Sequence, residues 1–309
     1  MAISAKQVKE LREISGAGMM DCKKALTETD GDMDKAVEWL RENGLAKAAK
    51  KADRIAAEGM VSINIDASGK KASIVEVNSE TDFVAKNEKF QTYVKDVACQ
   101  VMNSSATDID TFMAEKWQDS DVTVDDNNKA MIAVIGENLK IRRFERVETT
   151  GLIGSYIHNG GKIGVIVEVD TDSDADAVKQ AIEMIAMQVC SMNPKYLSDA
   201  DVDQDWLNSE KEVLRAQINN DPKEASKPDK VKEGMIAGRI KKQLKEVCLL
   251  DQAYVFAEDG KQSVKQYCDS VAKDNGCKFE IKSYIRFETG EGIEKKSEDF
   301  AAEVAAQMQ

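Results

Sequence analysis

The chain contains a single histidine, His158, and any Ser–His or Cys–His nucleophile would have to use it. This histidine stands in the segment 156–162, between two apolar runs that read as strands. The setting favours a hairpin loop, and no nucleophile–base pattern surrounds the residue. An enzyme centred on His158 is one alternative, and it predicts that His158→Ala abolishes a turnover activity.

Cysteine chemistry is limited in a similar way. The six cysteines are scattered and form no C-x-x-C pair: Cys22, Cys99, Cys190, Cys248, Cys268 and Cys277. Together with one histidine they offer too few ligands at the spacing of a zinc site. We expect free thiols, as in a reducing cytosol.

Two acidic runs, at 170–176 and 199–205, alternate aspartates as calcium-binding loops do. A calcium loop needs a glycine for its sharp turn, but the first run has Ala175 there and the second has Gln204. Both runs are better explained as acidic helix starts, which the helix dipole favours.

Two glycine motifs are also incomplete. Gly16-Ala17-Gly18 opens like a dinucleotide fingerprint, but Asp21 replaces its third glycine and no strand is predicted before it. The segment 160–163 lacks the first glycine and the Ser/Thr of a P-loop. The sequence therefore predicts no catalytic, metal-binding or nucleotide-binding constellation.

Length and composition indicate a globular protein. The 309 residues allow about two domains with a real core, and 42% hydrophobic with 32% charged residues is a globular composition. A formal charge of −13 argues against a surface that coats nucleic acid. The N-terminus has no apolar leader and no run is apolar enough to span a membrane. We therefore expect a cytoplasmic protein that binds neither membrane nor nucleic acid directly.

The elements that would position any site begin with three short helices. The first carries the apolar stripe Val8, Leu11 and Ile14, and the third is expected over 33–40, with its stop at Gly44. A lysine-studded, Ala-rich connector follows, which we interpret as a solvated helical spacer.

An internal repeat comes next, because 59–78 aligns without gaps on 151–170. Each copy predicts a two-stranded hairpin around a Gly-Lys turn, followed by a helix at 90–101 in the first copy and 178–189 in the second.

The first copy carries a few extra residues between strand and helix, at 80–86. This extra segment places Phe83 beside Asp82, which is typical of an exposed interaction site. The alternative is a helix N-cap at Thr81 or Asp82 with Phe83 folded inward.

Between the copies, 108–128 reads as an acidic loop, followed by a helix near 124–137 and a strand near 141–147. After the second copy, the pattern predicts strands at 254–256 and 278–288 and helices at 264–275 and 297–308.

All three prolines fall in one window, around two helical stretches at 202–218 and 230–245. They predict a helical hairpin inserted into the second half. The apolar residues expected to face each other across it are Trp206, Leu207, Val213, Leu214, Val231, Met235, Ile236 and Ile240. Two helices cannot bury both faces alone, so self-association is a hypothesis, with packing against the core as the alternative.

Four segments resemble the bacterial elongation factor Ts family, nearly from end to end and in the family's order. They are Val8–Arg12 with Gly16–Leu26, Thr81–Lys86, Ile135–Asn138 with Arg142-Arg143, and Arg286–Glu294. The resemblance implies an α+β fold with an N-terminal ubiquitin-associated-like three-helix domain and connector at 1–56. It implies a first core half at 57–150, a second at 151–193 and 247–289, a self-association hairpin at 194–246 and a C-terminal helical module at 290–309.

The resemblance also implies a function. The chain would be the guanine-nucleotide exchange factor of elongation factor Tu, promoting GDP release by disturbing the Mg²⁺ and phosphate site, so that GTP can bind. It would be neither an enzyme nor a nucleotide-binding protein, and would need no cofactor.

Site residues follow from the same motifs. In the segment Thr81, Asp82, Phe83 and Val84, the family pattern makes Phe83 an apolar wedge between helices of the G domain and Asp82 the group that disturbs the Mg²⁺ surroundings. Further partner contacts are implied for Arg12, Met19, Met20, Lys23, His158, Val255 and Phe256, although Phe256 departs from the family's usual residue.

A second hypothesis takes the N-terminal helices as an adaptor for small folded partners. It predicts that residues 1–56 bind such a partner alone and makes the segment 80–86 incidental. GDP release from elongation factor Tu distinguishes the two hypotheses.

Overall fold

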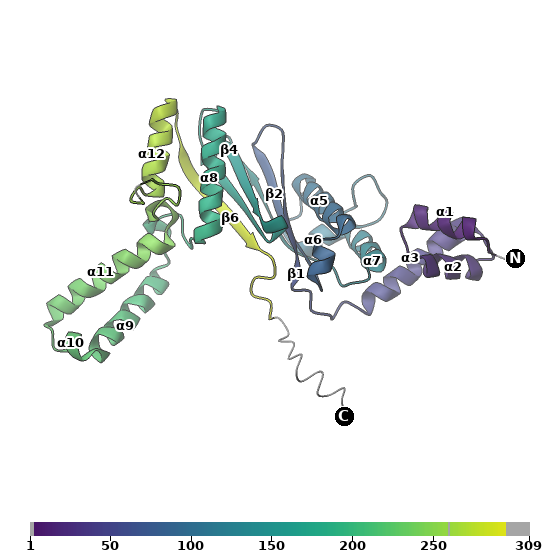
Figure 1. Ribbon diagram of the computed structural model, residues 1–309, viewed down its shortest axis with the longest axis horizontal. Helices are drawn as coiled ribbons and strands as arrows, with labels where there is room; N and C mark the ends of the chain where they lie inside the picture. Colours follow the sequence, from purple (N-terminus) through teal and green to yellow (C-terminus); the bar gives the residue numbers. More distant parts are fainter. Residues whose placement is uncertain (1–2, 259, 295–309) are drawn as a thin grey trace.

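The computed structural model describes residues 3–258 and 260–294 of the chain. The molecule is elongated, with a group of N-terminal helices and a helical hairpin at opposite ends and two sheets between them (Figure 1). In these residues, no helix has both the length and the apolar character needed to cross a bilayer. The predicted α+β class is confirmed, whereas the predicted helix at 297–308 lies outside the described residues.

The three N-terminal helices are α1 (Ala5–Ser15), α2 (Met19–Glu28) and α3 (Met33–Ala49). They enclose a small core around Leu11, Cys22 and Leu26. Ile14 was expected in this core, but its side chain is 61% exposed. Ile14 is still within α1, but a spacing of three residues drifts around a helix of 3.6 residues per turn, so Ile14 lies about 120° around the helix from Val8 and away from the core.

The expected stop of the third helix at Gly44 is wrong, because α3 continues through this residue to Ala49. Gly44 lies against α7 (Val124–Ile135), and a Cβ atom there would stand 3.2 Å from Ala133 Cβ. The glycine therefore serves close helix packing instead of a helix end.

The first half of the core contains a three-stranded antiparallel sheet with the order β1 (Glu58–Ile65), β2 (Lys71–Ser79) and β3 (Lys140–Glu148). Its helices are α4 (Asp82–Ala85), α5 (Glu88–Asn103), α6 (Ile109–Ala114) and α7. The acidic segment expected as a loop thus contains α6, which Asp108 caps and the buried Phe112 anchors to the core.

The second half repeats this plan with β4 (Leu152–His158), β5 (Ile163–Asp170) and β6 (Glu280–Glu288). Its helices α8 (Asp176–Met192) and α12 (Val264–Asn275) pack with this sheet in one core. The strand expected at 254–256 is wrong. The chain turns there, and the Val255 N–H donates to Gln188 Oε1 at 2.8 Å instead of to a neighbouring strand.

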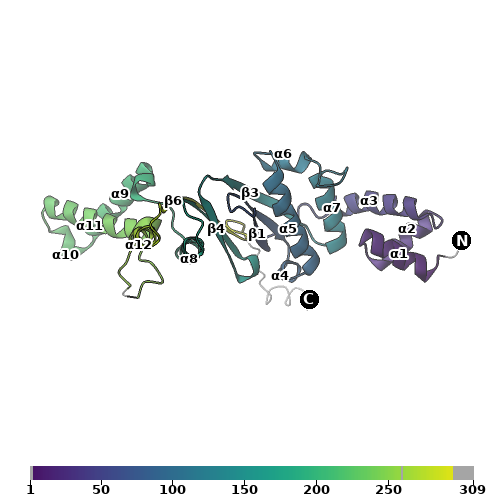
Figure 2. The same ribbon diagram turned by 90° about the horizontal axis from the view of Figure 1, so that it is seen from above.

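The two sheets face each other, and the helices cover their outer faces (Figure 1; Figure 2). Alternation along β2 explains this arrangement, since Val75 and Val77 point toward α5 while Ile74 points toward the other sheet. In β5, Val165 and Val167 likewise meet the helical side and Ile166 meets the first sheet. Each sheet is therefore packed on both faces, against its own helices on one face and against the other sheet on the other face.

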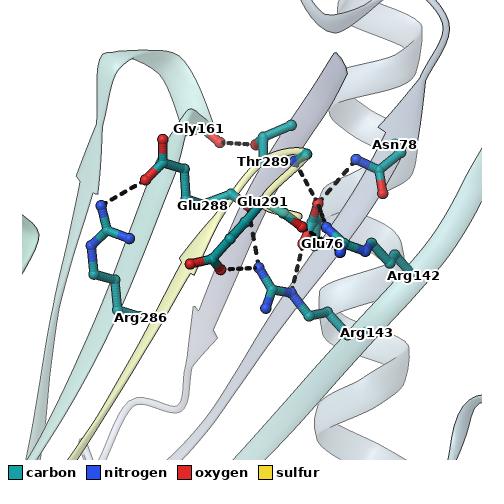
Figure 3. Close-up of polar contacts among 10 residues, drawn as sticks. Glu76, Asn78, Arg142, Arg143, Gly161, Arg286, Glu288, Thr289 and Glu291 are labelled. Atoms are coloured by element: carbon teal, nitrogen blue, oxygen red, sulfur yellow. Dashed lines mark hydrogen bonds and ion pairs between the residues drawn. The ribbon is translucent and has the colours of Figure 1, made fainter. Parts of the chain in front are cut away.

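A buried ionic cluster joins the halves (Figure 3). Glu76 of β2 is fully buried and accepts bonds from Arg142 Nη1 at 3.0 Å and Arg143 Nε at 2.6 Å. The Gly290 N–H, which follows β6 in the second half, donates to Glu76 Oε1 at 2.8 Å. Arg143 also contacts Glu291 at 2.9 Å. We call these five residues the Glu76 cluster.

The helical hairpin consists of α9 (Gln204–Asn220), the single turn α10 (Pro222–Ala225) and α11 (Asp229–Val247). Its own core contains Leu214, Ile218, Ile236 and Ile240, with Leu207, Met235 and Leu244 partly buried. Val213 and Val231 do not face inward as expected and are exposed. Val213 stands one residue before the buried Leu214, about 100° around α9 from it, and Val231 stands five residues before Ile236, about 140° around α11. Trp206 instead packs against Tyr196, with ring centroids 5.9 Å apart, at the base of the hairpin.

Candidate functional site

The segment 80–86, here called the Phe83 turn, presents the most exposed large apolar side chain of the described residues. Phe83 is 81% exposed, on the single turn α4. The Thr81 hydroxyl caps this turn by accepting from the Val84 N–H at 3.4 Å, and Val84 packs partly against the first-half core. The exposure expected of an interaction segment is therefore found at Phe83; the alternative is right about the N-cap, at Thr81, and wrong about an inward Phe83.

Asp82 places a charge beside this ring. Its carboxylate is 2.6 Å from Lys86 Nζ, one helical turn along. The hydrogen bond from Lys86 lowers the pKa of Asp82 below its usual value. At neutral pH the Phe83 turn therefore offers an apolar ring next to an ionised carboxylate.

The segment 158–162, here called the His158 turn, lies against the same strand as the Phe83 turn. A Cβ atom on Gly161 would stand 2.8 Å from Met60 Cβ of β1, and the φ of 97° at Gly161 also requires glycine. Met60 in turn belongs to the apolar cluster that Val84 packs against. Both α4 and the turn at 159–161 contact β1, which places two predicted contact segments on one strand.

His158 itself ends β4 and is exposed. Its Nδ1 atom lies 3.2 Å from the Tyr156 hydroxyl, and the two rings are 5.9 Å apart. The hairpin position predicted for this histidine is confirmed.

The predicted N-terminal contact residues form an exposed surface on α1 and α2. Arg12, Met19, Met20 and Lys23 are all exposed, Met20 at 74%. Ile14 of α1 is exposed as well, although sequence reasoning assigned it to the core. No sequence signal separates the two roles, because a spacing of three residues fits a buried stripe equally well.

Val255 and Phe256 occupy a loop near α12, and both are close to half exposed. The Phe256 ring meets Tyr254 edge-on, with centroids 5.5 Å apart. The loop is in the second half and the N-terminal surface is beyond the first, so the two lie in different parts of the long molecule (Figure 1). The predicted contact residues therefore lie in separate exposed patches.

Two buried thiols are held in their neutral form. Burial raises the pKa of Cys248 to about 11 and that of Cys268 to about 12, so both thiols stay protonated at neutral pH. All six cysteines, which lie within the described ranges, are free. In the same ranges no group of three or more His, Cys, Asp or Glu side chains is placed to hold a metal ion. Exposed apolar side chains beside charges are typical of a protein-binding surface.

Comparison with known proteins agrees with this interpretation. A sequence model of the family described as "Elongation factor TS" matches residues 80–291, which begin at the Phe83 turn and end in the Glu76 cluster. The chain is 52% identical over 304 residues to elongation factor Ts of Clostridium perfringens (strain SM101 / Type A), covering 98% of each chain. It is 49% identical over 309 residues to elongation factor Ts of Clostridium tetani (strain Massachusetts / E88), covering 99% of this chain and 100% of that one. The chain therefore belongs to the elongation factor Ts family.

Proposed function

We propose that this protein is a cytoplasmic translation elongation factor, the guanine-nucleotide exchange factor of elongation factor Tu, and that Phe83 is its wedge. The observation that carries the proposal is an 81% exposed phenylalanine on a capped and anchored turn of a family member. An exchange factor must bind the nucleotide-free partner more tightly than the GDP-bound one. A ring that inserts only when the nucleotide site opens supplies such a difference.

The free energies involved indicate that a phenylalanine wedge acts together with other contacts. Accelerating GDP release a thousandfold requires about 4 kcal/mol. Burying one exposed phenylalanine supplies about 2 kcal/mol, roughly half of that requirement. We assign the remainder to Asp82, acting on the Mg²⁺ surroundings, and to contacts of Thr81, Val84 and His158.

The other patches would hold the partner while the wedge acts. We propose that Arg12, Met19, Met20 and Lys23 bind the same G domain, with Ile14 added to this surface. Val255 and Phe256 would contact a further part of elongation factor Tu. Spreading the contacts along the molecule allows binding to survive the loss of any single one.

The test is stopped-flow release of a fluorescent GDP from elongation factor Tu. We expect Phe83→Ala to lower the release rate at saturating factor by about thirtyfold, because about 2 kcal/mol of burial is lost. Met192→Ala, at an exposed apolar residue that ends α8 in the second half, is the matched control and should release GDP as fast as wild type.

Two results would contradict parts of the proposal. If Phe83→Ala releases GDP as fast as wild type, His158 and the N-terminal surface, and not Phe83, would account for the acceleration. No acceleration by the wild-type protein would remove the exchange function and favour the adaptor hypothesis.

We further propose that the hairpin mediates self-association. Val213 on α9 and Val231 on α11 are each 46% exposed on its outer surface, where the hairpin's own core does not use them. We expect sedimentation equilibrium to show a dimer for wild type and a dissociation constant raised about tenfold or more by Val213→Glu with Val231→Glu. Glu145→Gln, on an exposed part of β3, is the control. Wild type that stays monomeric at high concentration would contradict this proposal.

A further inference from the structure

The helix in the Phe83 turn is too short to be stable by itself. α4 has only four residues, and each of its side chains is at least partly exposed. A helix of one turn is not stable in isolation, because nucleation costs more than a single turn returns. Contacts outside α4 must therefore fix the direction in which Phe83 points.

Besides the packing of Val84 and Ala85 on the first-half core, three polar contacts come from the carboxylate of Glu137, in the loop between α7 and β3. Glu137 Oε2 accepts from the Glu80 N–H at 3.1 Å and from the Thr81 N–H at 3.0 Å. Glu137 Oε1 accepts from the Thr81 hydroxyl at 2.7 Å. One half-buried side chain thus binds three donors at the start of the Phe83 turn.

A second bond runs in the opposite direction. Glu80 Oε1 accepts from the Asn138 N–H at 2.6 Å, so the Phe83 turn and the 137–138 loop each bind the backbone of the other with a carboxylate. The Asn138 side chain is buried and donates to the carbonyls of Ala52 at 3.2 Å and Arg54 at 2.8 Å.

The 137–138 loop is itself held from the N-terminal side. Lys51, just after α3, donates to the Gly136 carbonyl at the end of α7. Close packing of Gly44 on Ala133 fixes α3 against α7 a few turns earlier. The loop that carries Glu137 is therefore bonded on one side to the end of the N-terminal helices and on the other to the Phe83 turn.

We infer that Glu137 is a positioning residue for nucleotide exchange, which sets the Phe83 turn in its active orientation before the partner binds. The inference rests on the proposed wedge function of Phe83. A segment that is already ordered loses less entropy on binding, so more of its contact energy is available to open the nucleotide site. A carboxylate suits the role best, because it accepts from all three donors at once and its charge strengthens the bonds, whereas a glutamine keeps one acceptor oxygen for the two N–H groups and must donate to the Thr81 hydroxyl.

The test combines Glu137 and Phe83 variants in the GDP-release assay with the full-length protein. We expect Glu137→Ala to lower the maximal release rate about tenfold and to leave the half-saturating concentration within about twofold, because the other patches still bind. Glu137→Gln should fall between wild type and Glu137→Ala. Glu145→Gln, which removes an exposed carboxylate from the neighbouring strand β3, should match wild type.

The double variant decides whether Glu137 acts through Phe83. If it does, adding Glu137→Ala to Phe83→Ala should change the release rate by less than about twofold. Multiplied losses in the double variant, or a Glu137→Ala effect confined to the half-saturating concentration, would overturn the inference while leaving the wedge intact.

Amide hydrogen exchange of the free protein gives a readout independent of activity. Glu137→Ala should speed exchange at the Glu80 and Thr81 amides about tenfold or more, with the Ser79 amide and the other residues of β2 unchanged. Unchanged protection at both amides would overturn the inference, even if exchange activity fell. A wild-type protein that does not accelerate GDP release would instead refute the proposed function, and the amide result would still report whether Glu137 orders the turn.

Discussion

Replacing Glu76 by glutamine should lower the free energy of unfolding by about 3 kcal/mol, because it leaves two guanidinium groups without their shared carboxylate. Glu76 is fully buried, while Arg142 and Arg143 keep 24% and 31% of their side-chain surface exposed. The partial exposure of the arginines keeps the expected loss at the lower end of the range for broken buried ion pairs.

The same substitution should loosen the contact between the two halves of the core. Glu76 is the acceptor for the Gly290 N–H, and Arg143 stacks on Phe287 of β6 with its guanidinium carbon 4.2 Å from the ring centre. Thr289 adds a bond from its hydroxyl to the Gly161 carbonyl at 3.1 Å, beside the His158 turn. Loss of the cluster should therefore also raise amide exchange in the His158 turn.

The pH dependence follows from the pKa of Glu76. Burial alone would raise this pKa, but hydrogen bonds from Gly290, Asn78 and Arg142 and the charge of Arg143 outweigh burial and lower it. A carboxylate with a lowered pKa stabilises the fold above its unfolded pKa, near 4.5, and loses this contribution as the pH falls through the folded value. The difference in unfolding free energy between wild type and Glu76→Gln should be constant near neutral pH. It should become smaller as the pH falls below about 4.5, the unfolded pKa.

The internal repeat supplies the control. Glu168 occupies the position of Glu76 in the second copy, but it is only partly buried and accepts from Ser283 Oγ at 2.8 Å. Urea unfolding should show a loss below about 1 kcal/mol for Glu168→Gln. Equal losses for the two variants, or a Glu76→Gln difference that does not narrow in acid, would contradict the ionic role of Glu76.

Regular patterns allowed much of the fold to be predicted from the sequence. The repeat identified both hairpins, and the helix at 264–275 was predicted with the bounds that the structure has. These elements have strong local signals, namely alternation, a capping serine at Ser263 and a helix-ending glycine at Gly276.

Positions governed by contacts distant in sequence were predicted poorly. Gly44 looks like a helix end, but its neighbour Ala133 on α7 makes it a packing residue. Ile14 and Tyr254–Phe256 fit a core stripe and a strand, and only their tertiary surroundings decide otherwise. Likewise, Glu137 lies in a segment that resembles the family, but its bonds to the Phe83 turn join residues more than fifty positions apart.

The repeat also conceals a difference in role. Glu76 and Glu168 are identical in an ungapped alignment, but only the first half supplies an arginine pair on the adjacent strand β3. Recognising Glu76 as the buried link between the halves requires the arginines and Gly290 together in space. Arg142, Arg143, Gly290 and Glu291, which lie in two of the segments that resemble the family, thus form the contact between the sheets, whereas the Phe83 turn carries the proposed function.

The second large effect is expected at the glycine that opens each copy of the repeat. A Cβ atom on Gly59 would stand 2.2 Å from the Val77 carbonyl oxygen, and one on Gly151 would stand 2.0 Å from that of Val169. The clashing atoms belong to the backbone of the paired strand, so they cannot move without disturbing the hairpin register. At Gly59 the φ of 125° adds backbone strain for any other residue.

We therefore expect Gly59→Ala and Gly151→Ala each to lower the free energy of unfolding by about 3 kcal/mol, with Gly59→Ala the more severe of the two. Urea unfolding followed by circular dichroism measures both losses. If Gly59→Ala does not fold, Gly151→Ala still tests the clash without the contribution from φ.

The matched control is Gly238→Ala, the same substitution in the exposed face of α11. A Cβ atom there meets nothing within 4 Å, so only the backbone entropy of the unfolded chain changes. This variant should gain about 0.5–1 kcal/mol, which gives the opposite sign for an identical chemical change. A loss at Gly151 of less than about 1 kcal/mol would mean that the paired strand can shift, and it would contradict the close approach as the reason that both copies begin with glycine.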